Sequence, residues 1–195
     1  MGLTKKQLTW TIGIVVLIIA VAIPYTAQKR RPVQDDRVYE PPTEEEIGSI
    51  QEEGVIQVSI ESERGTIDLD LRADLMPLTV ANFVKLAEAG FYDGLTFHRV
   101  EDWVIQGGDP EGTGVGGPGY TIELETSPEL KNVRGAIAMA RKTDPDSAGS
   151  QFYILREDAD WLDGDYAVFG NVTSGMEAVD EMQVGDTITK ISVDR

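Results

Sequence analysis

Side chains that carry nucleophilic or acid–base chemistry are few in this chain. Its 195 residues contain no cysteine and one histidine, His98. Thiolate nucleophiles, disulfides and thiolate-ligated metal sites are therefore excluded. Ser150 lies in Gly-Ser-Gln, which lacks the second glycine of a nucleophile elbow, and no pattern pairs His98 with an aspartate. We interpret His98 as a core histidine.

Two further motifs suggest ligands but fail on their context. Residues 112–117, GTGVGG, match the spacing of a dinucleotide-binding loop, yet prolines stand on both sides and a strand-like segment follows. Such a loop needs a strand before it and a helix after it, so that the helix amino terminus faces the pyrophosphate. Residues 158–165, DADWLDGD, suggest a calcium loop, but Leu162 stands where an oxygen ligand is required. We expect neither a cofactor nor a metal ion.

Six short blocks of sequence carry more specific information. They are FHRV at 97–100, VIQGGD at 104–109, AMA at 138–140, GSQFYI at 149–154, WLDG at 161–164 and VFG at 168–170. Their order and spacing resemble the cyclophilin family of peptidyl-prolyl cis-trans isomerases over about residues 55–195. The resemblance implies a mainly β fold, namely a closed eight-stranded antiparallel barrel with two capping helices. We expect the barrel to be monomeric. The resemblance also implies a proline-binding groove on the outer face of the barrel.

The resemblance assigns the catalytic role to Arg99 and Gln106. Rotation about an Xaa-Pro bond breaks no covalent bond and only loses amide conjugation, against a barrier of ~18–20 kcal/mol. As the amide twists, the prolyl nitrogen regains a lone pair, so a fixed guanidinium that donates to it stabilises the twisted state. Arg99 would be that donor, and Gln106 would orient it and contact the substrate backbone. The reaction needs no cofactor.

The substrate groove follows from the same resemblance. We expect the substrates to be polypeptides that contain Xaa-Pro bonds. The positions that match the proline pocket are Trp103, Val104, Tyr153 and Leu162. Ala140 and Gln151 match the groove beside it, and Trp161 and Tyr166 match its rim.

Three departures from the family pattern affect this groove. The segment between Val100 and the pocket aromatic is one residue shorter than is common, and that aromatic is Trp103 where Phe is usual. Arg141 and Lys142 follow Ala140 where relatives often have a small polar residue. We hypothesise that these two cations favour acidic peptides. The shortened segment leaves an alternative open, a non-catalytic module that binds proline segments on the same fold.

Alternating apolar and polar residues predict the strands that must position these side chains. Residues 56–60 and 67–71 each place their apolar side chains on one face, with a hairpin at Arg64-Gly65 between them. Further strands are predicted at 136–140, 151–155, 167–172 and 188–193.

Helices are predicted from capping residues and a period of 3.6. A helix from about 79 to 89 would be capped by Thr79 and ended by Gly90, and Ser174 would cap a second helix. Residues 43–46 match a capping box, which predicts a short helix ahead of the strands.

Charge divides the chain into parts. Its formal charge is -17, but residues 1–31 hold five basic side chains and no acid. We predict a basic transmembrane segment at 1–31, an acidic, proline-containing linker at 32–54 and the cyclophilin-like domain at 55–195. Residues 8–27 are uncharged and long enough to cross a ~30 Å hydrocarbon core as a helix, which predicts a single-pass membrane anchor. The excess of acid argues against nucleic acid as a partner.

The orientation of this anchor is not set by its flanking charges. Basic residues stand on both sides of the apolar run, which nearly cancels the positive-inside bias. We favour an extracytoplasmic domain that assists the folding of exported or membrane proteins. Ala20-Val21-Ala22 also fits a signal-peptidase site, so a secreted enzyme released by cleavage after Ala22 is the alternative.

Overall fold

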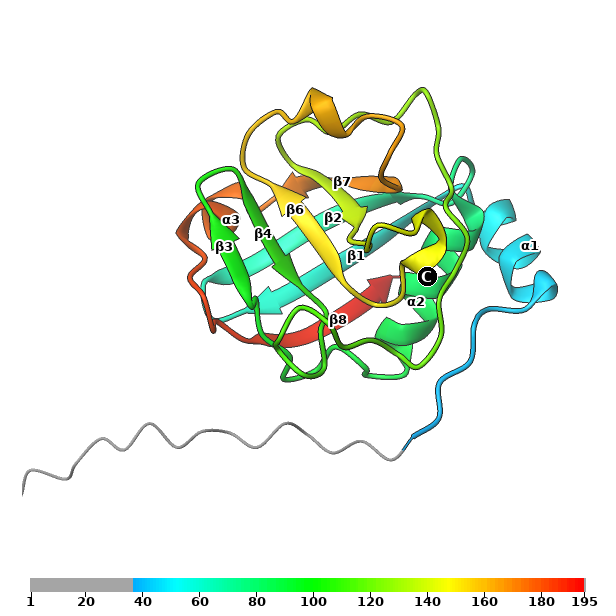
Figure 1. Ribbon diagram of the computed structural model, residues 1–195, viewed down its shortest axis with the longest axis horizontal. Coiled ribbons are helices and arrows are strands. Elements are labelled where there is room, and N and C mark those ends of the chain that lie inside the picture. The colour runs from blue at the N-terminus through cyan, green and yellow to red at the C-terminus, as the bar shows by residue number, and fades with distance from the viewer. Residues whose placement is uncertain (1–36, 195) are drawn as a thin grey trace, which may run out of the picture. The chain divides into compact units, whose positions relative to one another are not determined.

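The computed structural model describes residues 37–194, so the segment 8–27 assigned to the membrane lies outside the described residues. None of the helices formed by residues 37–194 is long and apolar enough to cross a membrane. Within residues 37–194, three α-helices and eight strands follow one another (Figure 1). They are α1 Glu44–Glu53, β1 Val55–Ser62, β2 Gly65–Arg72, α2 Pro77–Glu88, β3 Arg99–Glu101, β4 Val104–Gly107, β5 Ala136–Met139, β6 Phe152–Leu155, β7 Val168–Ser174, α3 Met176–Glu181 and β8 Ile188–Asp194.

The strands form one curled antiparallel sheet in the order β3-β4-β6-β5-β7-β2-β1-β8. Within residues 37–194 no ladder joins the edge strands β3 and β8, which corrects the closed barrel expected from the sequence to a curled half-barrel. The edge strand β3 has three residues. The segment before β3 contacts the start of β8 and the residues just before it, since Phe97 N donates to Asp186 O at 2.9 Å and Ile188 N donates to Leu95 O at 2.8 Å.

The predicted two-residue periodicity of the first hairpin is confirmed. Ile56, Val58 and Ile60 of β1 are at most 2% exposed, and the apolar residues of β2 at 67, 69 and 71 are fully buried. The register pairs Ser62 with Gly65, so the hairpin turns at residues 63–64 as expected. The inner face of the sheet therefore carries the core, as alternation with a solvated outer face requires.

Helix α2 begins at Pro77, two residues earlier than predicted, and Thr79 is not its cap. The carboxylate of Glu125 accepts hydrogen bonds from Leu78 N at 3.1 Å and Thr79 N at 2.7 Å. A residue distant in sequence thus satisfies amides that a side-chain cap would otherwise take. The Thr79 hydroxyl is buried without a hydrogen-bond partner.

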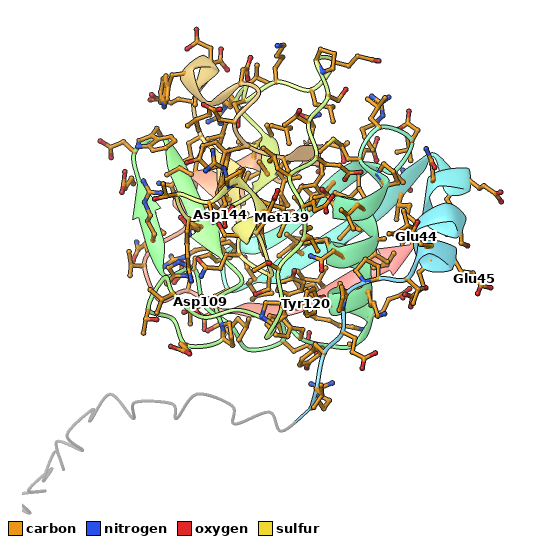
Figure 2. All side chains as sticks on the ribbon, turned by 45° about the vertical axis from the view of Figure 1, so that its right-hand side comes forward. Glu44, Glu45, Asp109, Tyr120, Met139 and Asp144 are labelled. Atoms are coloured by element: carbon orange, nitrogen blue, oxygen red, sulfur yellow. The ribbon has the colours of Figure 1, made fainter. Side chains whose placement is uncertain are left out.

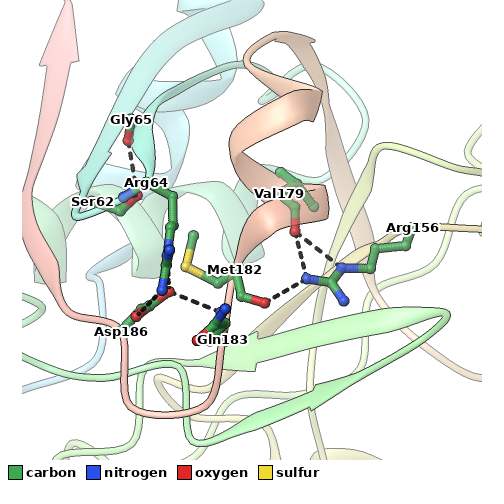
Figure 3. A network of polar contacts seen from close by, with 8 residues as sticks. All are labelled: Ser62, Arg64, Gly65, Arg156, Val179, Met182, Gln183 and Asp186. Atoms are coloured by element: carbon green, nitrogen blue, oxygen red, sulfur yellow. Dashed lines mark hydrogen bonds and ion pairs between the residues drawn. The ribbon is translucent and has the colours of Figure 1, made fainter.

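Helix α3 follows Gly175, and Ser174, the predicted cap, is the last residue of β7. Gly175 has φ +86° and its position would bring a Cβ within 2.1 Å of Thr66 O, so only glycine fits there. The carboxyl end of α3 is held by Arg156, whose guanidinium donates to Val179 O and Met182 O (Figure 3).

The same Arg156 also supports the β3–β4 hairpin. Its Nη1 donates to Glu101 O at 3.1 Å and its backbone N donates to Trp103 O at 2.8 Å. One side chain therefore ties the hairpin to α3. Beside it, Arg64 donates to Asp186 at 2.6 Å and 3.1 Å and links β1–β2 to the loop before β8 (Figure 3).

The capping box predicted at residues 43–46 is confirmed in α1. Thr43 N donates to the Glu46 carboxylate at 2.6 Å, and Glu46 N donates to the Thr43 hydroxyl at 3.3 Å. Glu46 also accepts from Lys85 of α2 at 2.9 Å, and Ile50 is buried. The Thr43 amide and the Lys85 ammonium hold the pKa of Glu46 below its ordinary value. Helix α1 lies against the outer side of α2 (Figure 1), and Glu44 and Glu45 are exposed on it (Figure 2).

Candidate active site

The β3–β4 hairpin brings Arg99 and Gln106 together. Its register pairs Arg99 with Gln106 and Glu101 with Val104, so only two residues form the turn. Side chains two apart on a strand point to the same face, which places Glu101 beside Arg99. The shortened segment noted in the sequence is therefore accommodated by a tight hairpin that keeps Arg99 and Gln106 in register.

Three neighbours fix the Arg99 guanidinium. Its Nε donates to Glu101 Oε1 at 2.7 Å and its Nη1 donates to Gln106 Oε1 at 3.2 Å. Its Cζ lies 5.3 Å from the centroid of the Trp103 ring, within cation–π range. A guanidinium has five N–H donors, and these two bonds leave three of them for a ligand.

Glu101 bridges Arg99 and Trp103. Its second carboxylate oxygen accepts the indole N–H of Trp103 at 2.9 Å. The hydrogen bond from Arg99 holds the pKa of Glu101 below its ordinary value, so the bridge is ionised at neutral pH. An indole in place of the usual phenyl ring thus brings a polar atom, and the adjoining carboxylate satisfies it.

A relay of amide side chains extends from Arg99 across the sheet. Gln106 Nε2 donates to Gln151 Oε1 at 2.9 Å, and Gln151 Nε2 donates to Gly116 O at 2.9 Å. Because Gln106 uses its oxygen for Arg99 and its nitrogen for Gln151, the relay fixes the direction of its amide. The loop around Gly116 is thereby linked to the guanidinium.

A cavity of about 110 Å³ opens directly beside Arg99, and we call it the proline cavity. Val104 and Tyr153 are at most 5% exposed and make its floor apolar. Eight of the residues predicted for the site line it, together with Arg141: Arg99, Trp103, Val104, Gln106, Ala140, Tyr153, Leu162 and Tyr166.

The hydroxyl of Tyr153 is the polar atom of this floor, and it is satisfied. It donates to Asn132 Oδ1 at 2.7 Å, and Asn132 is held in turn by the Asp163 carboxylate. Burial raises the pKa of Tyr153 well above its ordinary value, so the hydroxyl remains neutral. The floor of the proline cavity therefore presents no charge to a ligand.

The two remaining predicted residues lie elsewhere. Gln151 lines a second cavity of about 240 Å³, which shares Gln106, Ala140 and Arg141 with the proline cavity. Trp161 lines neither cavity and is 63% exposed, with its ring 5.8 Å from that of Trp103. Trp161 thus stands beside the groove and does not form its wall.

The second cavity is bounded by the loop that contains the glycine motif. The motif is followed by a loop, and residues 118–135 form no helix. Asp109, which is 1% exposed, accepts hydrogen bonds from Glu111 N at 2.8 Å and Thr113 N at 2.9 Å, and from Gly114 N. Burial would raise the pKa of Asp109, but these amides outweigh it and lower the pKa.

Residues missing from the predicted site include Glu101, Asp109 and Asn132, whereas Arg141, which the sequence places beside the groove, lines both cavities. The spacing of two between Arg99 and Glu101 was a usable signal. Nothing in the local sequence indicates that Asn132 would receive the hydroxyl of a tyrosine 21 positions later. His98 lies outside both cavities and is half-buried, with both ring nitrogens covered.

This arrangement is suited to a reaction without bond cleavage. It joins a small apolar cavity, the size class of a proline ring, to a fixed cation with unused N–H donors at the rim. Such a pair can hold a prolyl ring while a donor stabilises charge that develops on its nitrogen. The fold and site together define a half-barrel protein with a small apolar cavity beside a fixed guanidinium.

Comparison with known proteins identifies the family. The sequence model of the family described as "Cyclophilin type peptidyl-prolyl cis-trans isomerase/CLD" matches residues 55–194. Peptidyl-prolyl cis-trans isomerase B of Bacillus subtilis is 50% identical over 131 residues, which cover 66% of this chain and 90% of the relative. The chain therefore belongs to the cyclophilin-type family, and it is a peptidyl-prolyl cis-trans isomerase.

Solved structures agree with this assignment. A cyclophilin-type isomerase of Cryptosporidium parvum superposes with a TM-score of 0.68 at 31% identity, over 72% of this chain and 98% of that one. A second structure of it, in the presence of the dipeptide Ala-Pro, gives a TM-score of 0.67 over 71% of this chain and 99% of that one. The resemblance stated from six sequence blocks is confirmed.

Proposed function

We propose that this isomerase binds extended polypeptide segments with proline in the proline cavity and that Arg99 donates to the prolyl nitrogen as the amide twists. The observation that carries the proposal is the fixed guanidinium at the cavity rim, with Nε on Glu101, Nη1 on Gln106 and three donors unused. The dipeptide Ala-Pro used with the Cryptosporidium parvum relative supports an Xaa-Pro ligand for that protein and, by extension, here.

The energetic demand on the site is moderate. Uncatalysed rotation takes tens to hundreds of seconds, and about a thousand events per second would require a barrier lower by about 7 kcal/mol. One preorganised donor is worth about 3 kcal/mol when the polar environment is fixed before the reaction. The remainder would come from desolvation of the amide in the groove and from contacts with the substrate backbone.

The test is exchange spectroscopy by NMR. An alanine-based peptide with one Ala-Pro bond is mixed with a catalytic amount of the full-length chain, and cis-trans exchange cross-peaks are followed. Exchange faster than in the peptide alone supports the proposal. Peptide chemical shifts that change while exchange stays slow would instead establish the alternative of a module that binds without catalysis.

We further propose a membrane location for the domain, with residues 8–27 as its anchor and residues 32–43 as part of the spacer. The uncharged 20-residue run and its basic flanks support this, and an extracytoplasmic side would place the isomerase where exported and membrane proteins fold. Mass spectrometry of the mature amino terminus and membrane fractionation test it. An amino terminus at Ile23 in the soluble fraction would favour the secreted form.

We also propose that the domain acts as a monomer, because Arg99, Gln106 and the apolar residues of the proline cavity already form a complete site within the described residues. Sedimentation of the detergent-solubilised protein at micromolar concentration tests this. A dimer would contradict it.

A further inference from the structure

The second cavity has an unusual charge for this domain. Residues 32–195 carry 12 basic against 34 acidic side chains. Among the residues that line the second cavity, however, the charged ones are Arg141 and Lys142, and no carboxylate lines it. The cavity is thus a cationic depression in an acidic surface, which is the complement of an anionic ligand.

Neither cation is neutralised by the protein. Six other basic side chains of the described region form ion pairs, whereas within residues 37–194 no carboxylate lies within ion-pair distance of Arg141 or Lys142. Asp144 and Asp146 are close in sequence, but their carboxylates accept backbone N–H groups of Asp146 and Leu124 and do not line the cavity.

Arg141 is held in place without losing its charge. Its Nε donates to Asp165 O at 2.8 Å and its Nη1 donates to Lys142 O at 2.9 Å. Its Cζ lies 4.6 Å from the Tyr166 ring centroid. Contacts with carbonyl oxygens and a ring orient a guanidinium but do not neutralise its positive charge as a carboxylate would. The Nη2 of Arg141 makes no hydrogen bond within residues 37–194.

A peptide in the proline cavity would reach these charges. Arg141 lines both cavities, and so do Gln106 and Ala140, so the two cavities adjoin at these residues. The second cavity is about twice the volume of the first, large enough for a longer side chain. Lys142 is exposed at its rim and free to turn toward a ligand.

We propose that the second cavity is a subsite for the carboxylate of an Asp or Glu side chain that lies close to proline in the substrate. The proposal rests on the proposed function, because it assumes that the substrate places proline beside Arg99. Arg141 supplies the oriented cation and Lys142 the mobile one. The enzyme therefore selects acidic segments around Xaa-Pro bonds although its own surface is acidic.

The test compares peptides that differ in one charge. Glu, Gln or Lys is placed in turn at the three positions before proline and the one after it in an alanine-based peptide. Exchange spectroscopy with the full-length chain gives kcat/KM for each. At one position we expect kcat/KM of the Glu peptide to be about threefold that of the Gln peptide and about tenfold that of the Lys peptide, since partly exposed ion pairs contribute modestly. The difference should lie in KM and shrink in 0.5 M salt.

Variants locate the effect. Lys142→Glu should reverse the order of the Glu and Lys peptides, and Arg141→Gln should halve or remove the preference, while Arg141→Lys should retain it. Arg72→Gln removes one positive charge from a residue that lines neither cavity, so it is the matched control and should leave the ratio unchanged.

The outcomes separate this proposal from the proposed function. Equal kcat/KM for Glu and Lys peptides at every position, with normal turnover of the Gln peptide, would overturn the acidic subsite and leave the isomerase intact. If no peptide is turned over, the proposed function fails. Dissociation constants from chemical-shift titration of the Glu and Lys peptides then decide the subsite, and equal constants would overturn it as well.

Discussion

Replacement of Arg99 by lysine separates the charge of the catalytic side chain from its shape. Arg99 has five N–H donors and uses two of them to bind Glu101 and Gln106, which leaves three oriented donors. A lysine ammonium has three donors on a flexible stem. If it satisfied the same two partners it would keep one donor, with no fork to aim it.

The size of the effect follows from this loss of orientation. Removal of one preorganised donor from a buried site costs about 2.7–4 kcal/mol in other enzymes. The Arg99 side chain is 41% exposed, so water weakens its contacts and we take a lower value, about 2 kcal/mol, or about thirtyfold in kcat/KM. The proline cavity keeps its other walls, and KM should change by less than about threefold.

The assay is cis-trans exchange of an Ala-Pro peptide over a range of peptide concentrations, which separates kcat from KM. Thermal unfolding of both proteins verifies that the Arg99→Lys variant is folded. Arg72→Lys is the control, because Arg72 also pairs with a carboxylate, Asp74, but lines neither cavity. A lysine variant within threefold of wild type would show that positive charge is sufficient and would refute the argument from donor geometry.

Three further predictions concern stability. Asp186→Asn weakens the paired bonds from Arg64 and should lower the free energy of unfolding by about 1–2 kcal/mol at pH 7. Because Arg64 lowers the pKa of Asp186, the higher unfolding free energy of wild type is present above pH 3.8 and is lost as pH falls through the depressed pKa. An equal difference in unfolding free energy between wild type and Asp186→Asn at pH 2 and pH 7 would contradict this. Asp109→Asn should lower the free energy of unfolding by about 2–3 kcal/mol and should speed amide hydrogen exchange at residues 111–114. Unchanged hydrogen exchange at these residues would contradict this prediction. Gly170→Ala places a Cβ 2.5 Å from Asp70 O and should lower the free energy of unfolding by more than about 3 kcal/mol. Gly48→Ala, whose Cβ would meet no atom within 4 Å, is the control, and a wild-type urea midpoint for Gly170→Ala would disprove the contact.

Local patterns predicted most of the fold. Alternation identified β1 and β2 and their hairpin, and the capping box at residues 43–46 identified α1, because these features depend on neighbours in sequence. The cap of α2 was mispredicted because Glu125 lies 46 positions from Thr79, and no window of sequence contains both. Closure of the sheet was mispredicted because it depends on contacts between segments distant in sequence, which meet only in three dimensions.

The candidate site divides in the same way. The sequence blocks led to Arg99, Gln106 and most of the proline cavity, since those residues stand in the family register. They did not predict that Glu101 would bridge Arg99 and Trp103, because this contact arises from the geometry of the two-residue turn. They placed Trp161 at the rim, and its side chain is exposed beside the groove.

The central claim is that Arg99 stabilises the twisted amide, and one comparison tests it most directly. Exchange spectra of an Ala-Pro peptide are recorded with equal catalytic amounts of the wild-type full-length chain, Arg99→Ala and Arg72→Ala. We predict rapid exchange with wild type and Arg72→Ala, and at least about a hundredfold slower catalysis with Arg99→Ala while peptide binding persists. Equal catalysis by all three proteins would contradict the role assigned to Arg99.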